Sequence, residues 1–296
     1  GNPFYNSLND DLLLNANFPP SEFIRFKHNI DWFEYDWSLV LLNELDSFNR
    51  FLTFHRYGIN NNIWRIGFSE ATLVAYDIMT SKHVGYLMPS ALLLETEANR
   101  GDNANLMWLI DIMYKGGGWT IYGELLIDDF SLDGQSPNQI ASLIGFGKKI
   151  NKLLINFEIV NINKWTGNHC DPLKHWLEQN VPIGHRIGSN AYQILLDSYY
   201  IYNDKLSFEL SLNYIKHGMG DAIARISDWP EDLICDLNFD NFEDSKSNMF
   251  SKSSISGSFF YFISKNISMQ FNLDKLNSNL DYNLIINYGL NSNLKN

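Results

Sequence analysis

The strongest constraint in this sequence is an alternation of apolar and polar residues that recurs in segments of about ten residues. In LSFELSLNY (206–214) every second residue is leucine, phenylalanine or tyrosine, and serine, glutamate or asparagine lie between them. The segments ISMQFNL (267–273) and LDYNLIINYGL (280–290) repeat the pattern. Successive side chains of a strand point to opposite faces, so each segment predicts a β-strand with one apolar face.

The segment LMWLIDIMYKGGGWTIYGELLIDDF (106–130) predicts a hairpin, because glycine accepts the positive φ that tight turns require. We expect a four-residue turn over 115–118, which pairs Asp111 with Tyr122. That register collects the large apolar residues on one face and a polar set on the other. The polar set is Asp111, Tyr122 and Glu124.

The pattern fits two kinds of sheet: a soluble antiparallel sheet with one wet face, or a membrane β-barrel with a polar interior. We favour the barrel because the segments are near ten residues long and end in aromatic residues. The prediction is an all-β, antiparallel transmembrane β-barrel of about 14 strands, with 12–18 possible. The expected strands are 22–28, 34–45, 49–57, 62–72, 88–97, 106–114, 119–128, 141–147, 153–163, 191–202, 206–217, 255–264, 267–273 and 280–290.

The predicted connections alternate in length through most of the second half of the chain. Short ones fall at 115–118, 148–152, 203–205 and 265–266, and long ones at 129–140, 164–190 and 218–254. Outer-membrane barrels show this asymmetry, with tight periplasmic turns and long external loops. We expect one barrel domain over 1–296, in which 1–21 forms a periplasmic N-terminal segment.

Composition narrows the class further. Aromatic residues make up 15% of the chain. The sequence contains no run of 18 or more apolar residues, so it predicts no transmembrane helix. The net charge of −12 argues against nucleic-acid binding, which needs a basic surface. Cys170 and Cys235 lie in predicted loops, where one disulfide is compatible with an oxidising compartment. No HExxH, CxxC or GxSxG motif is present, so we expect no metal, no cofactor and no hydrolase elbow.

Four carboxylates raise the question of catalysis. A pair drawn from them could act as acid and base in glycoside cleavage, although no glycosidase motif surrounds them. A polar lining of the barrel interior is the favoured interpretation. The four are Asp111, Glu124, Asp128 and Asp129.

Other candidates for polysaccharide binding or for the lumen come from a strand and a long loop. In IWRIGFSEA (63–71), Arg65 points away from the apolar face and is expected to face the acidic strands, and Glu70 follows it. The loop WTGNHCDPLKHWLEQNVPIGHRIG (165–188) carries rings and polar groups that suit sugar recognition, or a loop that packs on itself. The loop candidates are Trp165, His169, Trp176 and His185.

Four segments together resemble the capsule assembly Wzi-like family of outer-membrane proteins. They are FHRYGINNNIWRIGFSEATLVAY (54–76), YLMPSALLLETEANRGDNANLMWLIDIM (86–113), YGELLIDDF (122–130) and PIGHRIGSNA (182–191). The matching elements are Gly67, Ser69 and Glu70; Tyr86, Leu87 and Pro89; Asp102 and Asn103; the Tyr122–Asp129 run; and Gly184, His185 and Gly188. Asp102 and Asn103 join the binding candidates on this ground.

The resemblance implies a monomeric barrel in the bacterial outer membrane, in contact with membrane lipid, that holds capsular polysaccharide or exopolysaccharide at the cell surface without catalysis. A porin for small solutes or sugars is the first alternative. A barrel-bound glycan hydrolase and a soluble β protein are the others.

Overall fold

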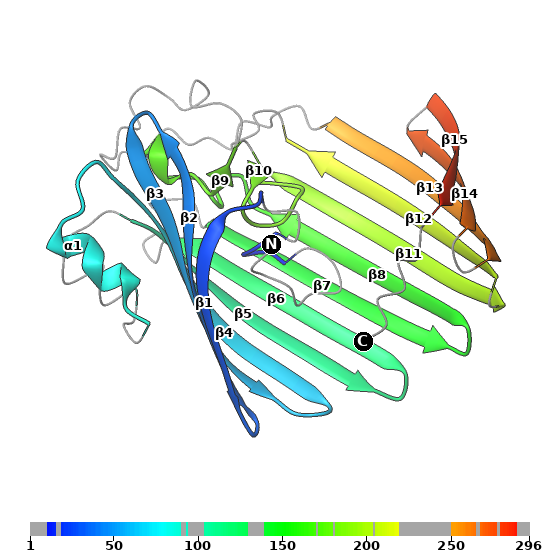
Figure 1. Ribbon diagram of the computed structural model, residues 1–296, viewed down its shortest axis with the longest axis horizontal. Helices are drawn as coiled ribbons and strands as arrows, with labels where there is room; N and C mark the ends of the chain where they lie inside the picture. The colour runs from blue at the N-terminus through cyan, green and yellow to red at the C-terminus, as the bar shows by residue number, and fades with distance from the viewer. Residues whose placement is uncertain are drawn as a thin grey trace.

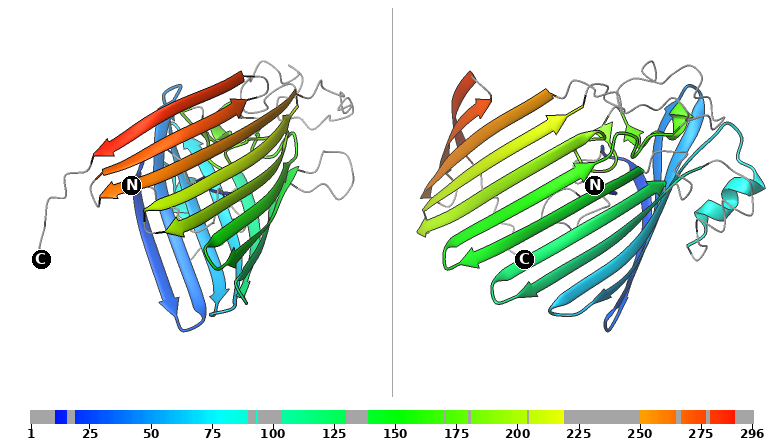
Figure 2. Two further views of the ribbon diagram at one scale, coloured as in Figure 1. Left: turned by 90° about the vertical axis from the view of Figure 1, so that its right-hand side faces the viewer. Right: turned by 180° about the vertical axis from the view of Figure 1, so that it is seen from behind.

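The chain forms one large antiparallel sheet that curls strongly around its own concave side (Figure 1, Figure 2). The computed structural model describes residues 11–15, 19–89, 93, 104–129, 139–169, 171–179, 181–203, 205–218, 250–264, 267–276 and 279–288. Its strands are β1 (Glu22–Ile30), β2 (Phe33–Leu45), β3 (Phe48–Asn60), β4 (Trp64–Tyr76), β5 (Asn105–Gly116), β6 (Trp119–Asp129), β7 (Gln139–Ile150), β8 (Leu153–Ile162), β11 (Ala191–Asn203), β12 (Leu206–His217), β13 (Phe250–Ser264), β14 (Ile267–Leu276) and β15 (Asn279–Tyr288).

The 13 strands pair in chain order, and within the described residues β1 and β15 form the two edges of the sheet. A separate hairpin of β9 (Leu177–Glu178) and β10 (Val181–Pro182) lies in the β8–β11 connection after the 3₁₀ helix η2 (Pro172–Lys174). The helix α1 (Ser81–Val84) and the 3₁₀ helix η1 (Gly85–Leu87) lie in the β4–β5 connection. No described helix is long and apolar enough to cross a membrane.

The two ends of the sheet differ as the sequence predicted. The connections that follow β1, β3, β5, β7, β11 and β13 are two or three residues long and share one end. The long connections, including 77–104, 163–190 and 218–249, all share the other end. We call these the short-turn end and the long-loop end; the short turns lie along the lower right edge of Figure 1.

The expected register of the 106–130 hairpin was wrong by two residues. Gly117 and Gly118 alone form the turn, with φ of 57° and 75°, and Asp111 pairs with Glu124 rather than with Tyr122. Two-residue turns with positive φ match the right-handed twist of the flanking strands, and glycine adopts positive φ readily, so the shorter turn is favoured here. Because the error is two residues, every side chain still points to the predicted face.

The strand expected over 88–97 was also wrong. Residues 88 and 89 lie outside any strand and Leu93 is helical. Pro89 has no N–H to donate to a neighbouring strand, and the Leu93 N–H donates to the Glu70 carboxylate at 3.3 Å instead. Leu93 and Tyr86 pack on the outer face of the sheet with Phe51 and Val74. In Figure 1 the helix α1 accordingly lies outside β2 and β3.

The main apolar core lies inside the curl. The inner faces of β2–β8 and β11 pack against residues 11–15, which we call the N-terminal segment, and against residues 163–190, which we call the interior loop. Leu12, Leu13 and Trp176 are buried among strand residues such as Leu52 and Leu143. Residues 11–15 therefore lie against the concave face of the sheet. The predicted periplasmic location of residues 1–21 stays a prediction.

Candidate functional site inside the sheet

The N-terminal segment is held inside the curl by hydrogen bonds from two directions. The Leu12 N–H donates to Glu124 Oε2 of β6 at 2.9 Å, and Trp176 Nε1 of the interior loop donates to the Leu13 carbonyl at 3.0 Å. A Cβ at Gly184 would lie 2.4 Å from the Leu12 carbonyl oxygen, so only glycine permits this approach. The interior loop and the N-terminal segment therefore pack together as one unit across the concave face.

Arg50 of β3 fixes the interior loop to the wall. Its Nη2 donates to the carbonyls of Leu177 at 2.7 Å and His175 at 3.3 Å, and its Nη1 lies 3.5 Å from Glu178 Oε2. Glu178 Oε1 accepts the Asn43 N–H of β2 at 2.9 Å. Both side chains of the ion pair are buried, so each depends on the other for its charge balance.

A second group of buried polar side chains lies between the interior loop and strands β6 and β8. Tyr122 donates its hydroxyl to Glu158 Oε2 of β8 at 2.7 Å, and His185 Nε2 lies 4.0 Å from Glu158 Oε1. All three side chains are buried. Burial lowers the pKa of His185 to about 3, so its ring is neutral at pH 7. In the same loop, burial lowers the pKa of His169 to about 4.

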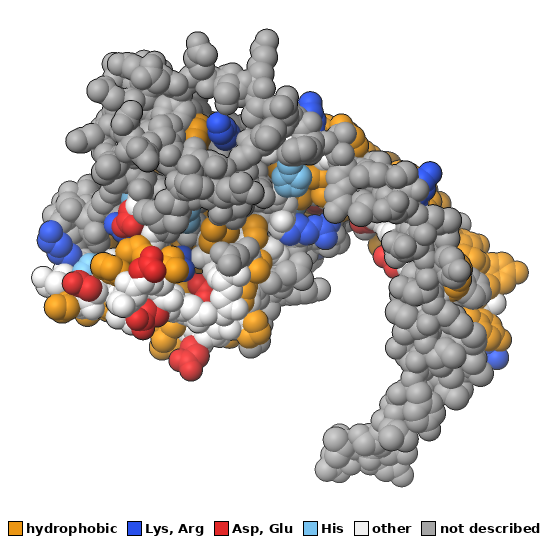
Figure 3. Space-filling view, turned by 90° about the horizontal axis from the view of Figure 1, so that it is seen from above, with side chains coloured by type: hydrophobic (Ala, Val, Ile, Leu, Met, Phe, Trp, Pro, Cys, Tyr) orange, Lys and Arg blue, Asp and Glu red, His pale blue; other side chains and the backbone are white. Residues whose placement is uncertain are grey.

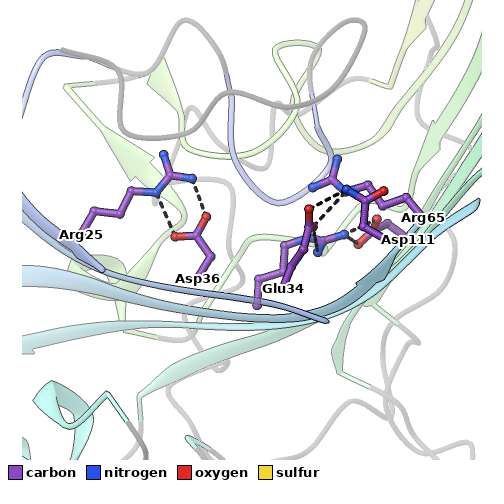
Figure 4. A network of polar contacts seen from close by, with 7 residues as sticks. Arg25, Glu34, Asp36, Arg65 and Asp111 are labelled. Atoms are coloured by element: carbon purple, nitrogen blue, oxygen red, sulfur yellow. Dashed lines mark hydrogen bonds and ion pairs between the residues drawn. The ribbon is translucent and has the colours of Figure 1, made fainter. Parts of the chain in front are cut away.

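Charged residues of β1–β5 form ion pairs on the inner face of the sheet (Figure 4). Arg25 of β1 pairs with Asp36 of β2. Arg56 of β3 donates to Asp111 at 2.6 Å and lies 3.7 Å from Glu34. Arg65 Nε lies 3.5 Å from the same Glu34 carboxylate. The sequence predicts Arg65 opposite acidic strands, and in the structure Arg56 and Glu34 join it.

This network borders a small cavity of about 30 Å³, lined by Asp11, Arg56, Arg65, Asp111, Tyr122 and Glu124. That volume suits about one or two ordered waters rather than a sugar ring. Burial raises the pKa of Asp11 to about 6, and Asp111 acts in the same direction. The cavity is therefore a small space between the N-terminal segment and the strands, too small to bind a large ligand.

The structure separates the predicted candidates into an inner group and others. Asp111, Tyr122, Glu124 and Arg65 lie together on the inner face. Glu70 does not join them: it shares the outer face with Ile66 and Phe68, where the β4–β5 connection buries it. Glu70 is two residues after Phe68 in β4, so both side chains point to the same face of the sheet.

The loop candidates also divide. Trp176 and His185 are 5% and 2% exposed, so they are core residues of the interior loop and not surface contacts. The sequence pattern predicted contacts on the external side. The loop instead folds toward the inner face of the sheet, where the side chains of Trp176 and His185 are buried. Trp165 and His169 remain partly accessible, and Lys164 Nζ lies 4.6 Å from the centre of the Trp165 ring.

The remaining candidates lie where the strands end or outside the described residues. Asp128 accepts the Gly167 N–H at 2.8 Å and so anchors the start of the interior loop. The backbone of Asp129 pairs with Gln139 across β6 and β7. Asp102, Asn103 and both cysteines lie outside the described residues.

Sequence reasoning missed Arg50, Arg56, Glu34 and Glu158. Arg56 had a usable signal: it shares a strand face with Leu52 and Phe54, two apolar residues that would have marked that face as inward. The partners of Arg50 come from about 125 residues away in the chain, so no local pattern contains them.

The predicted acid–base pairs have structural partners instead. Glu124 accepts the Leu12 N–H, Asp111 is paired with Arg56, and Asp128 accepts the Gly167 N–H. Among the residues that the structure describes, no group of three or more His, Cys, Asp or Glu side chains is arranged to hold a metal ion.

The outer face of the sheet carries a band of exposed apolar side chains. Ile66, Ile110, Ile112, Ile121 and Ile144 are 44–65% exposed. Hydrophobic side chains also project from the convex side of the strand group at the right of Figure 3. Exposed aromatic residues gather near the short turns: Trp32, Trp64, Trp119, Phe146 and Tyr202. Aromatic belts of this kind lie at membrane interfaces.

The curled, all-β antiparallel sheet with an apolar outer face is the fold of outer-membrane β-barrel proteins. It is similar to Wzi of Escherichia coli, an outer-membrane protein involved in group 1 capsule assembly and described as a carbohydrate-binding β-barrel. The TM-score is 0.61 at 14% identity over 95% of this chain. The match covers 65% of the Wzi chain, so this chain spans less than two thirds of that protein.

Two further solved structures match with lower scores. The monoaromatic hydrocarbon channel CymD gives a TM-score of 0.34 at 9% identity, over 90% of this chain and 80% of that one. OmpT, an outer-membrane protein of Vibrio cholerae, gives 0.32 at 7% identity, over 91% and 92%. No protein-family model and no curated protein sequence matches the chain.

Proposed function

We propose that this chain lies in the bacterial outer membrane as a monomer and binds or anchors capsular polysaccharide or exopolysaccharide at the cell surface, without catalysis. The observation that carries the proposal is the filled interior: the N-terminal segment and the interior loop cross the concave face and bury their rings there. An open porin needs a water-filled lumen, and this packing opposes one.

The structural likeness to a carbohydrate-binding barrel supports the polysaccharide part of the proposal. Trp165 is the best-placed described contact, because its ring is partly accessible in the loop that follows β8 and has a cation beside it. Aromatic rings stack on the apolar faces of sugars, and we take the roughly 0.5–1.5 kcal/mol of an aromatic–aromatic pair as the scale of one such contact.

The first test compares surface polysaccharide in the cell pellet and in the medium, with and without the gene. We expect deletion to move polysaccharide into the medium while total synthesis is unchanged, and the native gene to restore retention. Trp165→Ala should restore it incompletely, and should weaken binding of the purified chain to the polysaccharide by about two- to tenfold.

Trp32→Ala is the matched control, because Trp32 is exposed in the β1–β2 turn at the opposite end of the sheet. It should restore retention fully. An unchanged partition after deletion would contradict anchoring, and equal losses in both variants would contradict the assignment of Trp165.

A further inference from the structure

Lysine side chains gather on three adjacent turns at the short-turn end. The segments 115–120, 148–154 and 201–206 contain five lysines and one acid, Asp204, which lies outside the described residues. This local excess of positive charge stands out in a chain whose net charge is −12. We call the group the lysine rim: Lys115, Lys148, Lys149, Lys152 and Lys205.

Backbone hydrogen bonds make the rim one continuous surface. The Lys149 N–H donates to the Gly118 carbonyl at 2.9 Å, which joins the β7–β8 turn to the β5–β6 turn. The Ile201 N–H donates to the Lys152 carbonyl at 3.0 Å, which joins the β7–β8 turn to the end of β11, just before the β11–β12 turn. The opposite side of the same end differs, because the β1–β2 turn region, 29–34, carries two acids and no lysine.

The ammonium groups of the rim retain hydrogen-bonding capacity. Lys148 donates to the Gly117 carbonyl and Lys152 to the Tyr202 carbonyl, each at 2.9 Å, and each ammonium has two further N–H donors. Lys115, Lys149 and Lys205 are exposed, and no described carboxylate lies within 4.0 Å of them.

The rim adjoins the exposed aromatic and apolar band of the outer face. Lys148 Nζ lies 4.2 Å from the centre of the Trp119 ring. Trp119, Phe146, Ile150 and Tyr202 are 41–56% exposed. At a bilayer boundary, aromatic rings lie at the level of the headgroups, and lysine side chains extend past them to the phosphates.

We infer that the lysine rim binds the headgroups of anionic phospholipids in the leaflet at the short-turn end. A phosphate-bearing headgroup with net negative charge complements five ammonium groups, and its acyl chains would lie against the apolar band directly beside them. An acidic protein would not need that apolar neighbour, so the observations favour lipid. The inference rests on the membrane placement proposed above but not on polysaccharide binding.

The test measures lipid selectivity at the protein surface. The chain is reconstituted into phosphatidylcholine bilayers that contain a small fraction of spin-labelled phosphatidylglycerol or spin-labelled phosphatidylcholine. The protein-associated component of the spin-resonance spectrum gives the relative association of the two lipids. We expect native protein to prefer phosphatidylglycerol, and 1 M NaCl to remove the preference.

Lys149→Gln with Lys205→Gln should reduce the preference by about fivefold or more, since one lysine near an anionic surface contributes a factor of about five. The matched control, Lys82→Gln with Lys275→Gln, removes two exposed lysines away from the rim and should keep the native preference. Equal association of both lipids with native protein, or equal losses in both double variants, would overturn the inference. Failure of native protein to insert into the bilayers would instead overturn the membrane placement.

Discussion

At the scale of single residues, Arg50 ties the interior loop to β3 by three contacts from one guanidinium. Replacing it by methionine leaves Glu178 buried without its cation, which costs about 3–5 kcal/mol for such pairs. We expect Arg50→Met to raise amide hydrogen exchange in residues 174–183 while exchange in the strands stays low.

Two further variants of the Arg50 pair sharpen that prediction. Arg50→Met with Glu178→Leu removes both charges and should recover part of the protection, because an apolar pair has no buried charge to compensate. Arg25→Met breaks the ion pair with Asp36, away from the loop, and should leave loop exchange at the native level. Native exchange in Arg50→Met would mean that apolar packing alone seats the loop.

The buried histidines of the interior loop predict a loss of stability in acid. Burial lowers the pKa of His185 to about 3 and of His169 to about 4, whereas an unfolded histidine titrates near 6.5. Between those values the unfolded histidines bind more protons, so their contribution to the free energy of unfolding falls as pH falls from about 6.5 toward 3. His185 alone accounts for roughly 5 kcal/mol at most.

Urea midpoints between pH 7 and pH 4 test this dependence on the histidines. His185→Gln and His169→Gln should each flatten the dependence of the midpoint on pH. A double variant that keeps the full native slope would show that other groups cause the acid sensitivity.

At the scale of elements, the Gly117–Gly118 turn distinguishes backbone strain from side-chain contact. Both glycines have positive φ. A Cβ at Gly118 would lie 3.0 Å from the Lys149 carbonyl oxygen, whereas a Cβ at Gly117 would have no heavy atom within 4 Å. Gly118→Val should lower the free energy of unfolding by about 1–3 kcal/mol, and Gly117→Asn should change it little, since asparagine tolerates this conformation. Reversible urea unfolding of the two variants measures the difference; equal effects would contradict the turn geometry.

The β4–β5 connection makes a different prediction, because it packs on the outer wall rather than inside. Leu93 is fully buried against that wall, while Met88 is 49% exposed. Leu93→Asp loses roughly 1.5–3 kcal/mol of apolar burial and should open the connection to brief proteolysis within 77–104. Met88→Asp introduces the same charge on the exposed side and should leave the connection as resistant as in native protein.

The strands could be predicted from the sequence because a two-residue period is a local property. Thirteen of the fourteen expected strands are present, and even the misjudged turn kept Asp111 and Glu124 on the inner face. The candidate site could be predicted only where it lies on strands, as for Arg65 and Tyr122. The inward fold of the interior loop depends on contacts such as Trp176 with Leu13, 163 residues apart, and no local pattern contains them.

At the scale of the whole molecule, strand direction limits how the sheet can close. Thirteen strands alternate in direction, so β1 and β15 run the same way, and each has a single sheet neighbour within the described residues. Closure by antiparallel pairing, as in outer-membrane barrels, therefore requires an odd number of additional strands between them. Within the described residues, the inner faces of β2–β8 and β11 are already packed against the N-terminal segment and the interior loop.

The filled interior separates an anchor from a channel by ion conductance in planar bilayers. Native protein should show few steps, because the interior loop and the N-terminal segment occupy the concave face. Replacing residues 165–188 by a short Gly-Ser linker removes Trp176 and the partners of Arg50, and should produce large, stable steps. Arg50→Met should lie between the two, with brief openings as the loop loosens. Large steady conductance in native protein would contradict the anchor and favour the porin alternative, because an ion path through a fully seated loop would then have to exist.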